Sequence, residues 1–129
     1  MTATEQAARM ARIAAAAADD KKATDIVALD VSEALVITDV FLLCSGANEP
    51  QVSAIVDEVQ RRLGEAGFSA VRREGERERR WVLLDFVDIV VHVQHQEERV
   101  HYALERLWKD CPAVPLDGPD GGPDSPSTD

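Results

Sequence analysis

The fold is decided by residues 81–93, which read WVLLDFVDIVVHV. Apolar residues fill both halves, and Asp85-Phe86-Val87-Asp88 divides them, so we predict strands at 81–86 and 88–93 joined by a tight turn. Residues 97–110 then predict an amphipathic helix with Val100, Leu104, Leu107 and Cys111 on one face, and Tyr102 turned away from it. This segment holds no recognisable nucleophile motif or phosphate loop, which favours a binding surface over an active site.

The elements before this stretch complete a mixed sheet. Unbroken apolar runs at 25–30 and 40–44 are typical of strands covered on both faces. Residues 48–67 predict the clearest helix, with Asn48 as N-cap, Pro50 in its first turn and Gly67 as its stop. We also predict an alanine-rich helix at 4–18 with a thin apolar stripe, a strand at 68–73 and a solvated loop at 74–80. The order α-β-β-α-β-β-β-α predicts an α/β (α+β) fold, a mixed β-sheet with helices packed on it.

Length and composition indicate one domain and a tail. The chain has 129 residues, of which 45% are hydrophobic, and we assign the domain to residues 1–116. Residues 117–129 are rich in Gly and Pro and carry four Asp with no Lys or Arg. Such a segment cannot bury enough apolar surface to fold, so we expect a disordered acidic tail.

The charge of the chain restricts its partners. The formal net charge is −10, and −6 remains for residues 1–116 without the tail's four Asp. We therefore expect little or no direct nucleic-acid binding and a basic protein partner. No run approaches the roughly 20 apolar residues of a membrane span. Cys44 and Cys111 fit free thiols in a reducing cytosol, so a cytoplasmic location without membrane contact is expected.

Three groups of residues are candidates for other roles. His92, His95 and His101 lack the spacing of a metal site, and a structural or surface role is favoured. The Arg residues between 72 and 80 alternate with Glu, which favours a solvated loop over a contact with RNA. Trp108 is expected in the core, whereas Trp81 is equally compatible with an interface anchor and a core position.

Three blocks of the sequence resemble the ribosomal silencing factor (RsfS, or Iojap) family. They are the TDVFLLCSG block at 38–46, the WVLLDFVDIVVH block at 81–92 and the RVHYALERLWKDCP block at 99–112. The resemblance covers about residues 12–112. The chain departs from the family pattern at Pro50, Val87, Gln94 and His101.

The resemblance implies a fold related in topology to nucleotidyltransferases, and a regulator instead of an enzyme. Such a factor binds ribosomal protein L fourteen on the large ribosomal subunit and sterically blocks subunit joining, which represses translation under nutrient limitation. No catalytic residue, metal or cofactor is implied. The expected partner-binding residues are Trp81, Leu84, Asp85, Phe86, Asp88 and Tyr102.

Two alternatives and two local expectations follow from these residues. A nucleotidyltransferase-like enzyme would bind a nucleotide or metal between Ser45 and Asp85, although no D-x-D pair follows Ser45-Gly46. A homodimeric interaction protein with another basic partner is the second alternative. We expect the turn to avoid positive φ at Val87, because a β-branched residue is strained there. His92 is expected to be partly buried and hydrogen-bonded.

Overall fold

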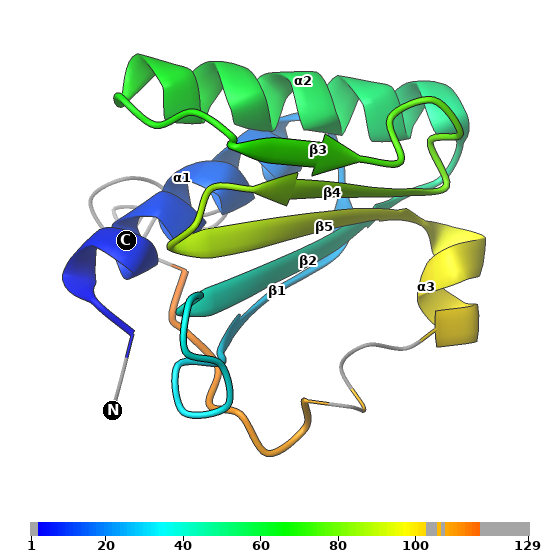
Figure 1. The fold of residues 1–129 in the computed structure, drawn as a ribbon. Helices are drawn as coiled ribbons and strands as arrows, with labels where there is room; N and C mark the ends of the chain where they lie inside the picture. The colour runs from blue at the N-terminus through cyan, green and yellow to red at the C-terminus, as the bar shows by residue number, and fades with distance from the viewer. Residues whose placement is uncertain (1–2, 103–105, 107, 117–129) are drawn as a thin grey trace, which may run out of the picture.

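The computed structural model describes residues 3–102, 106 and 108–116, and the side chains of residues 101 and 102 lie outside this description. Two layers make up the described part, with two helices covering one face of a five-stranded sheet (Figure 1). None of the described helices is long and apolar enough to cross a lipid bilayer. The elements are α1 Glu5–Asp20, β1 Thr24–Asp30, β2 Val40–Gly46, α2 Glu49–Glu65, β3 Arg72–Glu74, β4 Trp81–Asp85, β5 Ile89–His95 and α3 Gln96–Tyr102.

The sheet is mixed, as the sequence predicts. Its strand order is β1-β2-β5-β4-β3, with β2 and β5 parallel and every other neighbouring pair antiparallel. Parallel neighbours need a crossover connection, and α2 lies in the one that leads from β2 to β5. Val40 lies opposite Ile89, so β2 and β5 begin at the same end of the sheet. We call this the turn end, because it also holds residues 86–88 between β4 and β5.

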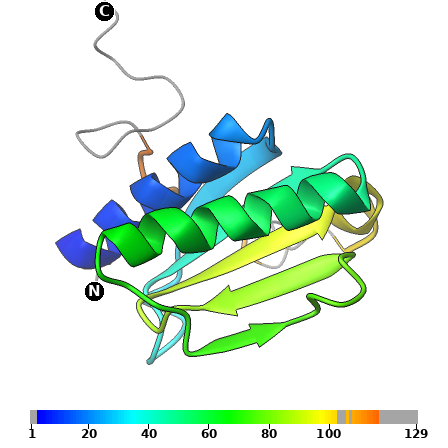
Figure 2. The ribbon, with the colours of Figure 1, turned by 90° about the horizontal axis from the view of Figure 1, so that it is seen from above.

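Small side chains allow α1 to pack closely. Half of its sixteen residues are buried: six are alanines, and the others are Met10 and Ile13. The helix lies beside α2 and also contacts the sheet (Figure 2). Its buried face is therefore wider than the thin stripe that we predicted, because two neighbours cover it from different sides.

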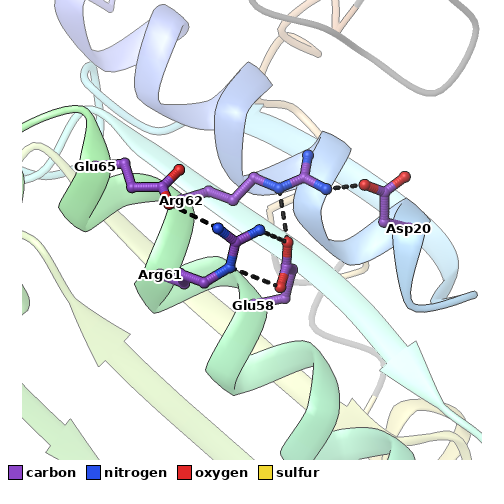
Figure 3. A network of polar contacts seen from close by, with 5 residues as sticks. All are labelled: Asp20, Glu58, Arg61, Arg62 and Glu65. Atoms are coloured by element: carbon purple, nitrogen blue, oxygen red, sulfur yellow. Dashed lines mark hydrogen bonds and ion pairs between the residues drawn. The ribbon is translucent and has the colours of Figure 1, made fainter.

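Charged side chains join the exposed surfaces of α1 and α2 (Figure 3). Arg62 pairs with Asp20 of α1 and donates from Nε to Glu58 at 2.8 Å. Arg61 reaches Glu58 and Glu65, each at 2.6 Å. The hydrogen bond from Arg61 holds the pKa of the Glu58 carboxyl below its ordinary value. This network links the end of α1 to the last turns of α2.

The predicted ends of α2 are confirmed. The Asn48 side chain accepts a hydrogen bond from the Gln51 amide at 2.9 Å, and Pro50 lies in the first turn. Gly67 follows the helix with φ of 97°, a conformation that glycine adopts without steric cost. The sequence therefore fixes both ends of this helix locally.

Two other predicted elements have different bounds in the described structure. The strand expected at 68–73 is present only as β3, because the preceding residues turn from α2 toward the sheet. Of the helix expected at 97–110, the structure describes residues 96–102 as α3 and residue 106 as helical, and residues 108–110 form a turn. That turn brings Trp108 back against Phe41 on the face of the sheet opposite α1 and α2.

This second face of the sheet is only partly covered. A small core of Leu29, Val31 and Leu43 lies there, packed against Trp108 and Cys111. The segment after Cys111 also pairs with the outer edge of β1, where the Asp30 amide donates to the Pro112 carbonyl at 2.7 Å. The β3–β4 side of the same face has no such cover among the described residues, and we call it the open face.

Candidate protein-binding surface

The alternation of side chains along β4 divides the predicted site into two groups. Val82 and Leu84 point toward α1 and α2 and are buried, whereas Trp81, Leu83 and Asp85 point to the open face and are half-buried. Phe86 is also buried in the main core. Leu84 and Phe86 were predicted to bind a partner, and the structure corrects this, because their side chains fill the core.

Leu83 is a residue of the open face that the sequence argument missed. Period-two alternation from Trp81 was the signal that could have found it, since residues 81, 83 and 85 of a strand share one face. Leu83 and Trp81 line a shallow hollow of about 390 Å³ with Glu74 and Gly75. The hollow therefore combines apolar surface with a carboxylate on its rim.

Gly75 shapes the loop beside Trp81. Its φ is 83°, and a Cβ atom at this position would lie 2.1 Å from the Trp81 carbonyl oxygen. That separation is far below any allowed contact, and the obstacle is backbone. Only glycine therefore lets residues 75–80 fold against the start of β4.

The Trp81 side chain is fixed by His92 of β5. The indole Nε1–H donates to His92 Nδ1 at 3.2 Å, with Leu83 as the β4 residue opposite His92. His92 is buried, and burial lowers its pKa to about 4. The imidazole is consequently neutral at pH 7, and its unprotonated Nδ1 can accept the hydrogen bond. The expected hydrogen bond of His92 is confirmed, and the residue is buried more deeply than the partial burial that we predicted.

The turn after β4 does contain a strained valine. Val87 has φ of 75°, so our expectation that the turn avoids positive φ there is wrong. The Val87 amide donates to the Asp85 carboxylate at 2.8 Å, and the Asp88 amide donates to the Phe86 carbonyl at 2.9 Å. These two bonds hold the reversal tight, and we assign about 1–3 kcal/mol of strain to a β-branched residue in this conformation.

Asp85 and Asp88 do not converge on one point. Asp85 binds the Val87 amide and lies 3.6 Å from Arg72, whereas Asp88 accepts a hydrogen bond from Gln6 of α1 at 2.7 Å. Among the described residues, no group of three or more His, Cys, Asp or Glu could hold a metal ion. The two acids therefore offer separate charges at the turn end.

The nucleotidyltransferase alternative requires Ser45 and Asp85 to face one another. Ser45 lies opposite Gln94 and Asp85 lies opposite Val90, so the two are offset by four residues along β5, or about 13 Å. The Ser45 hydroxyl also donates to the Thr24 carbonyl at 3.2 Å. This geometry gives the alternative no support.

Helix α3 is tied to β4 by charge. Arg80, just before β4, lies 2.8 Å from Glu97 and 3.1 Å from Glu98. The Glu97 amide donates to His95 Nδ1 at 3.2 Å. The backbone of Tyr102 ends α3, but its side chain lies outside the described residues, so its predicted place on the surface stays a prediction.

The basic residues of the 72–80 segment are largely matched by acids. Arg72 pairs with Glu74 and Asp85, and Arg79 lies 3.6 Å from Glu49 of α2. Arg73 donates to Gln60. This pairing agrees with the predicted weak net field of the segment.

Comparison with known proteins places this chain in one family. The sequence profile described as "Ribosomal silencing factor during starvation" matches residues 4–128. Ribosomal silencing factor RsfS of Bacillus subtilis is 48% identical over 106 residues, which cover 82% of this chain and 90% of the relative. The chloroplastic protein Iojap of Zea mays is 35% identical over 79% of this chain and 44% of its own length. The chain belongs to the ribosomal silencing factor family.

Two crystal structures support the same conclusion. A Chromobacterium violaceum protein superposes with a TM-score of 0.75 at 36% identity, covering 78% of this chain and 83% of that one. A Bacillus halodurans protein superposes with a TM-score of 0.71 at 45% identity, and the match covers 81% of this chain and 94% of that one. The relatives are named as silencing factors, which are regulatory proteins, and the chain has a role associated with the ribosome and the regulation of translation.

Proposed function

We propose that this protein binds ribosomal protein L fourteen on the large ribosomal subunit through its open face. Occupying that site sterically blocks the small subunit from joining, and this represses translation in the cytoplasm when nutrients are limiting. Binding alone is sufficient for this effect, and no chemical step is needed. The revised surface consists of Trp81, Leu83, Asp85, Asp88 and Tyr102.

The observation that carries this proposal is the half-buried Trp81 of a silencing factor, on a sheet face that the described residues leave uncovered. A tryptophan anchored by a hydrogen bond presents a large rigid area at low entropic cost, which is typical of interface hot spots. Leu83 extends the apolar centre, and Glu74 and Asp85 provide an acidic rim. A basic ribosomal protein complements this pattern, because apolar contacts at the centre and opposite charges at the rim favour association.

The experiment measures subunit joining directly. Purified protein is added to separated ribosomal subunits, and the fraction of joined ribosomes is determined by sedimentation. We expect that fraction to fall as protein is added, and to fall much less with Trp81→Ala. Calorimetric titration of isolated ribosomal protein L fourteen identifies the partner. An unchanged sedimentation profile at saturating protein would contradict the proposal, and joining blocked without binding to ribosomal protein L fourteen would assign the effect to another partner.

A further inference from the structure

The turn end of the sheet gathers exposed apolar side chains. Five large hydrophobic residues are exposed in the described part of the chain, and four of them lie beyond this end: Val36 at 99% exposure, Ile37 at 79%, Val71 at 68% and Val87 at 48%. The fifth, Val100, lies on α3 at the opposite end. We call the four residues at the turn end the turn-end patch.

Backbone hydrogen bonds bring the loop of Ile37 to the turn of Val87. The amides of Asp39 and Val40 both donate to the Asp88 carbonyl, at 3.0 and 3.3 Å. Ile37 is two residues before Asp39, and Val87 is adjacent to Asp88. The Val71 amide donates to the Asp85 carbonyl at 2.7 Å, which places this valine at the same end. The patch is thus a feature of the assembled sheet, drawn from three separate segments.

Folding does not explain the valine at position 87. Its side chain is half exposed, and its φ of 75° is one that β-branched residues avoid. Glycine or asparagine would satisfy the same turn without this strain. Strained conformations that contribute nothing to the core cluster at functional sites, so the strain favours a contact role for Val87.

The surroundings of the patch are acidic. Asp30, Glu33 and Asp39 lie at the end of β1 and in the loop that leads to β2, and residues 23–60 contain no Lys or Arg. Asp39 and Asp88 accept hydrogen bonds from the neutral Thr4 amide and Gln6 side chain, so these contacts leave their negative charge in place. Arg72, next to Val71, is paired with Glu74 and Asp85. Apolar side chains with an acidic border complement a basic protein surface that contains an apolar depression.

We propose that the turn-end patch is a second contact surface for the basic ribosomal protein that Trp81 engages, an inference that rests on the proposed function. Trp81 begins β4 and Val87 lies just beyond its end, so the two are about 20 Å apart along an extended chain. A standard interface buries roughly 800 Å² on each partner, a patch roughly 30 Å across, and can include both positions. The patch thereby extends the contact from the open face to the turn end.

Three variants test the proposal by calorimetric titration of ribosomal protein L fourteen beside thermal melting. Val36→Ser with Ile37→Ser should weaken binding about tenfold and leave the melting temperature nearly unchanged, because both side chains are already in solvent. Val87→Gly should raise the melting temperature and weaken binding. A purely structural role of Val87 cannot produce a gain in stability together with a loss of affinity. Val100→Ser is the matched control for loss of an exposed apolar side chain, and its binding should stay close to that of the unchanged protein.

The possible outcomes separate this inference from the proposed function. If Trp81→Ala weakens binding while the Val36→Ser and Ile37→Ser double variant binds like the unchanged protein, the turn-end patch is not a contact surface and the proposed function stands. An equal loss with Val100→Ser would also overturn the inference, because it would reflect a general dependence on exposed apolar area. If the unchanged protein does not bind ribosomal protein L fourteen, the proposed function itself fails.

Discussion

Trp81 and His92 form a hydrogen-bonded pair across neighbouring strands, with the indole Nε1–H donating to the imidazole Nδ1 at 3.2 Å. Phe41 lies against the same imidazole with ring centroids 4.9 Å apart, and Trp108 lies against Phe41 at 5.3 Å. A row of rings therefore crosses β4, β5 and β2 and continues to the C-terminal segment. The half-buried Trp81 is held at one end of this row by packed neighbours, which orients it without burying it.

The buried His92 predicts a loss of stability in acid. Its folded pKa of about 4 lies below the unfolded value of about 6.5, so the unfolded state binds the proton more readily. Stability is therefore fully present above pH 6.5 and falls as the pH drops toward 4, by about 3 kcal/mol. Urea unfolding from pH 7 to 4.5 measures this loss. His92→Gln should show a clearly smaller pH dependence, and an identical slope would contradict the assignment.

Val87→Gly should stabilise the fold. Relief of about 1–3 kcal/mol of strain exceeds the roughly 0.5–1 kcal/mol that glycine costs through its unfolded-state entropy. We expect a net gain of about 1 kcal/mol in the free energy of unfolding, measured by urea denaturation with an unchanged m-value. A neutral or destabilising result would mean that the turn tolerates valine without strain.

Gly75 and Gly64 predict opposite effects for the same substitution. Gly75→Ala should cost more than about 1 kcal/mol and shift Trp81 fluorescence, because positive φ and the Trp81 carbonyl leave no room for a Cβ atom. Gly64, inside α2, has open space around the position that a Cβ atom would take, with nothing within 4 Å, so Gly64→Ala should stabilise by about 0.5–1 kcal/mol. Equal melting temperatures for the two variants would contradict this account.

Arg80 should control the attachment of α3. Among the described side chains of α3, the charged Arg99 is the buried one and Val100 is exposed, so these side chains hold the helix little through apolar burial. Arg80→Glu should increase hydrogen exchange in residues 96–102, and added salt should increase it in the unchanged protein as well. Replacing Glu97 and Glu98 by Arg in the same chain should restore protection. Exchange that is unaffected by the charge reversal would show that other contacts hold α3.

The sequence was sufficient for the elements whose signals are local. Asn48, Pro50 and Gly67 mark the ends of α2 through capping and backbone geometry that depend on a few neighbouring residues. The strand β2 begins with a continuous apolar run and β5 begins with Ile89-Val90-Val91, and the crossover between them follows from the element order. These features needed no knowledge of which segments meet in space.

The candidate surface could be predicted only in part, because β4 is apolar on both faces. Trp81 and Asp85 share the open face, but Leu84 alternates to the other side and Phe86 continues into the core. Applying the two-residue period strictly would have replaced Leu84 by Leu83. The φ of Val87 was beyond sequence reasoning, because it depends on how the residues from Asp85 to Asp88 close the turn.

The decisive prediction for the surface compares Trp81→Ala, Asp85→Lys and Leu84→Ala. Trp81→Ala should cost about 2 kcal/mol or more in binding to ribosomal protein L fourteen, as hot-spot truncations do. It should cost less in folding than the roughly 3–5 kcal/mol of a core tryptophan, because the side chain is half-buried. Asp85→Lys should weaken binding through reversal of charge at the acidic rim, with the fold retained.

Leu84→Ala is the matched control, which should lose stability and keep its binding. It should cost roughly 2–5 kcal/mol in stability, because Leu84 lies wholly in the core, and the fraction that remains folded should bind normally. Calorimetry and thermal melting of all three variants check these outcomes. If Asp85→Lys binds as well as the unchanged protein, and Trp81→Ala lowers stability without affecting binding, then the interface lies elsewhere on this fold.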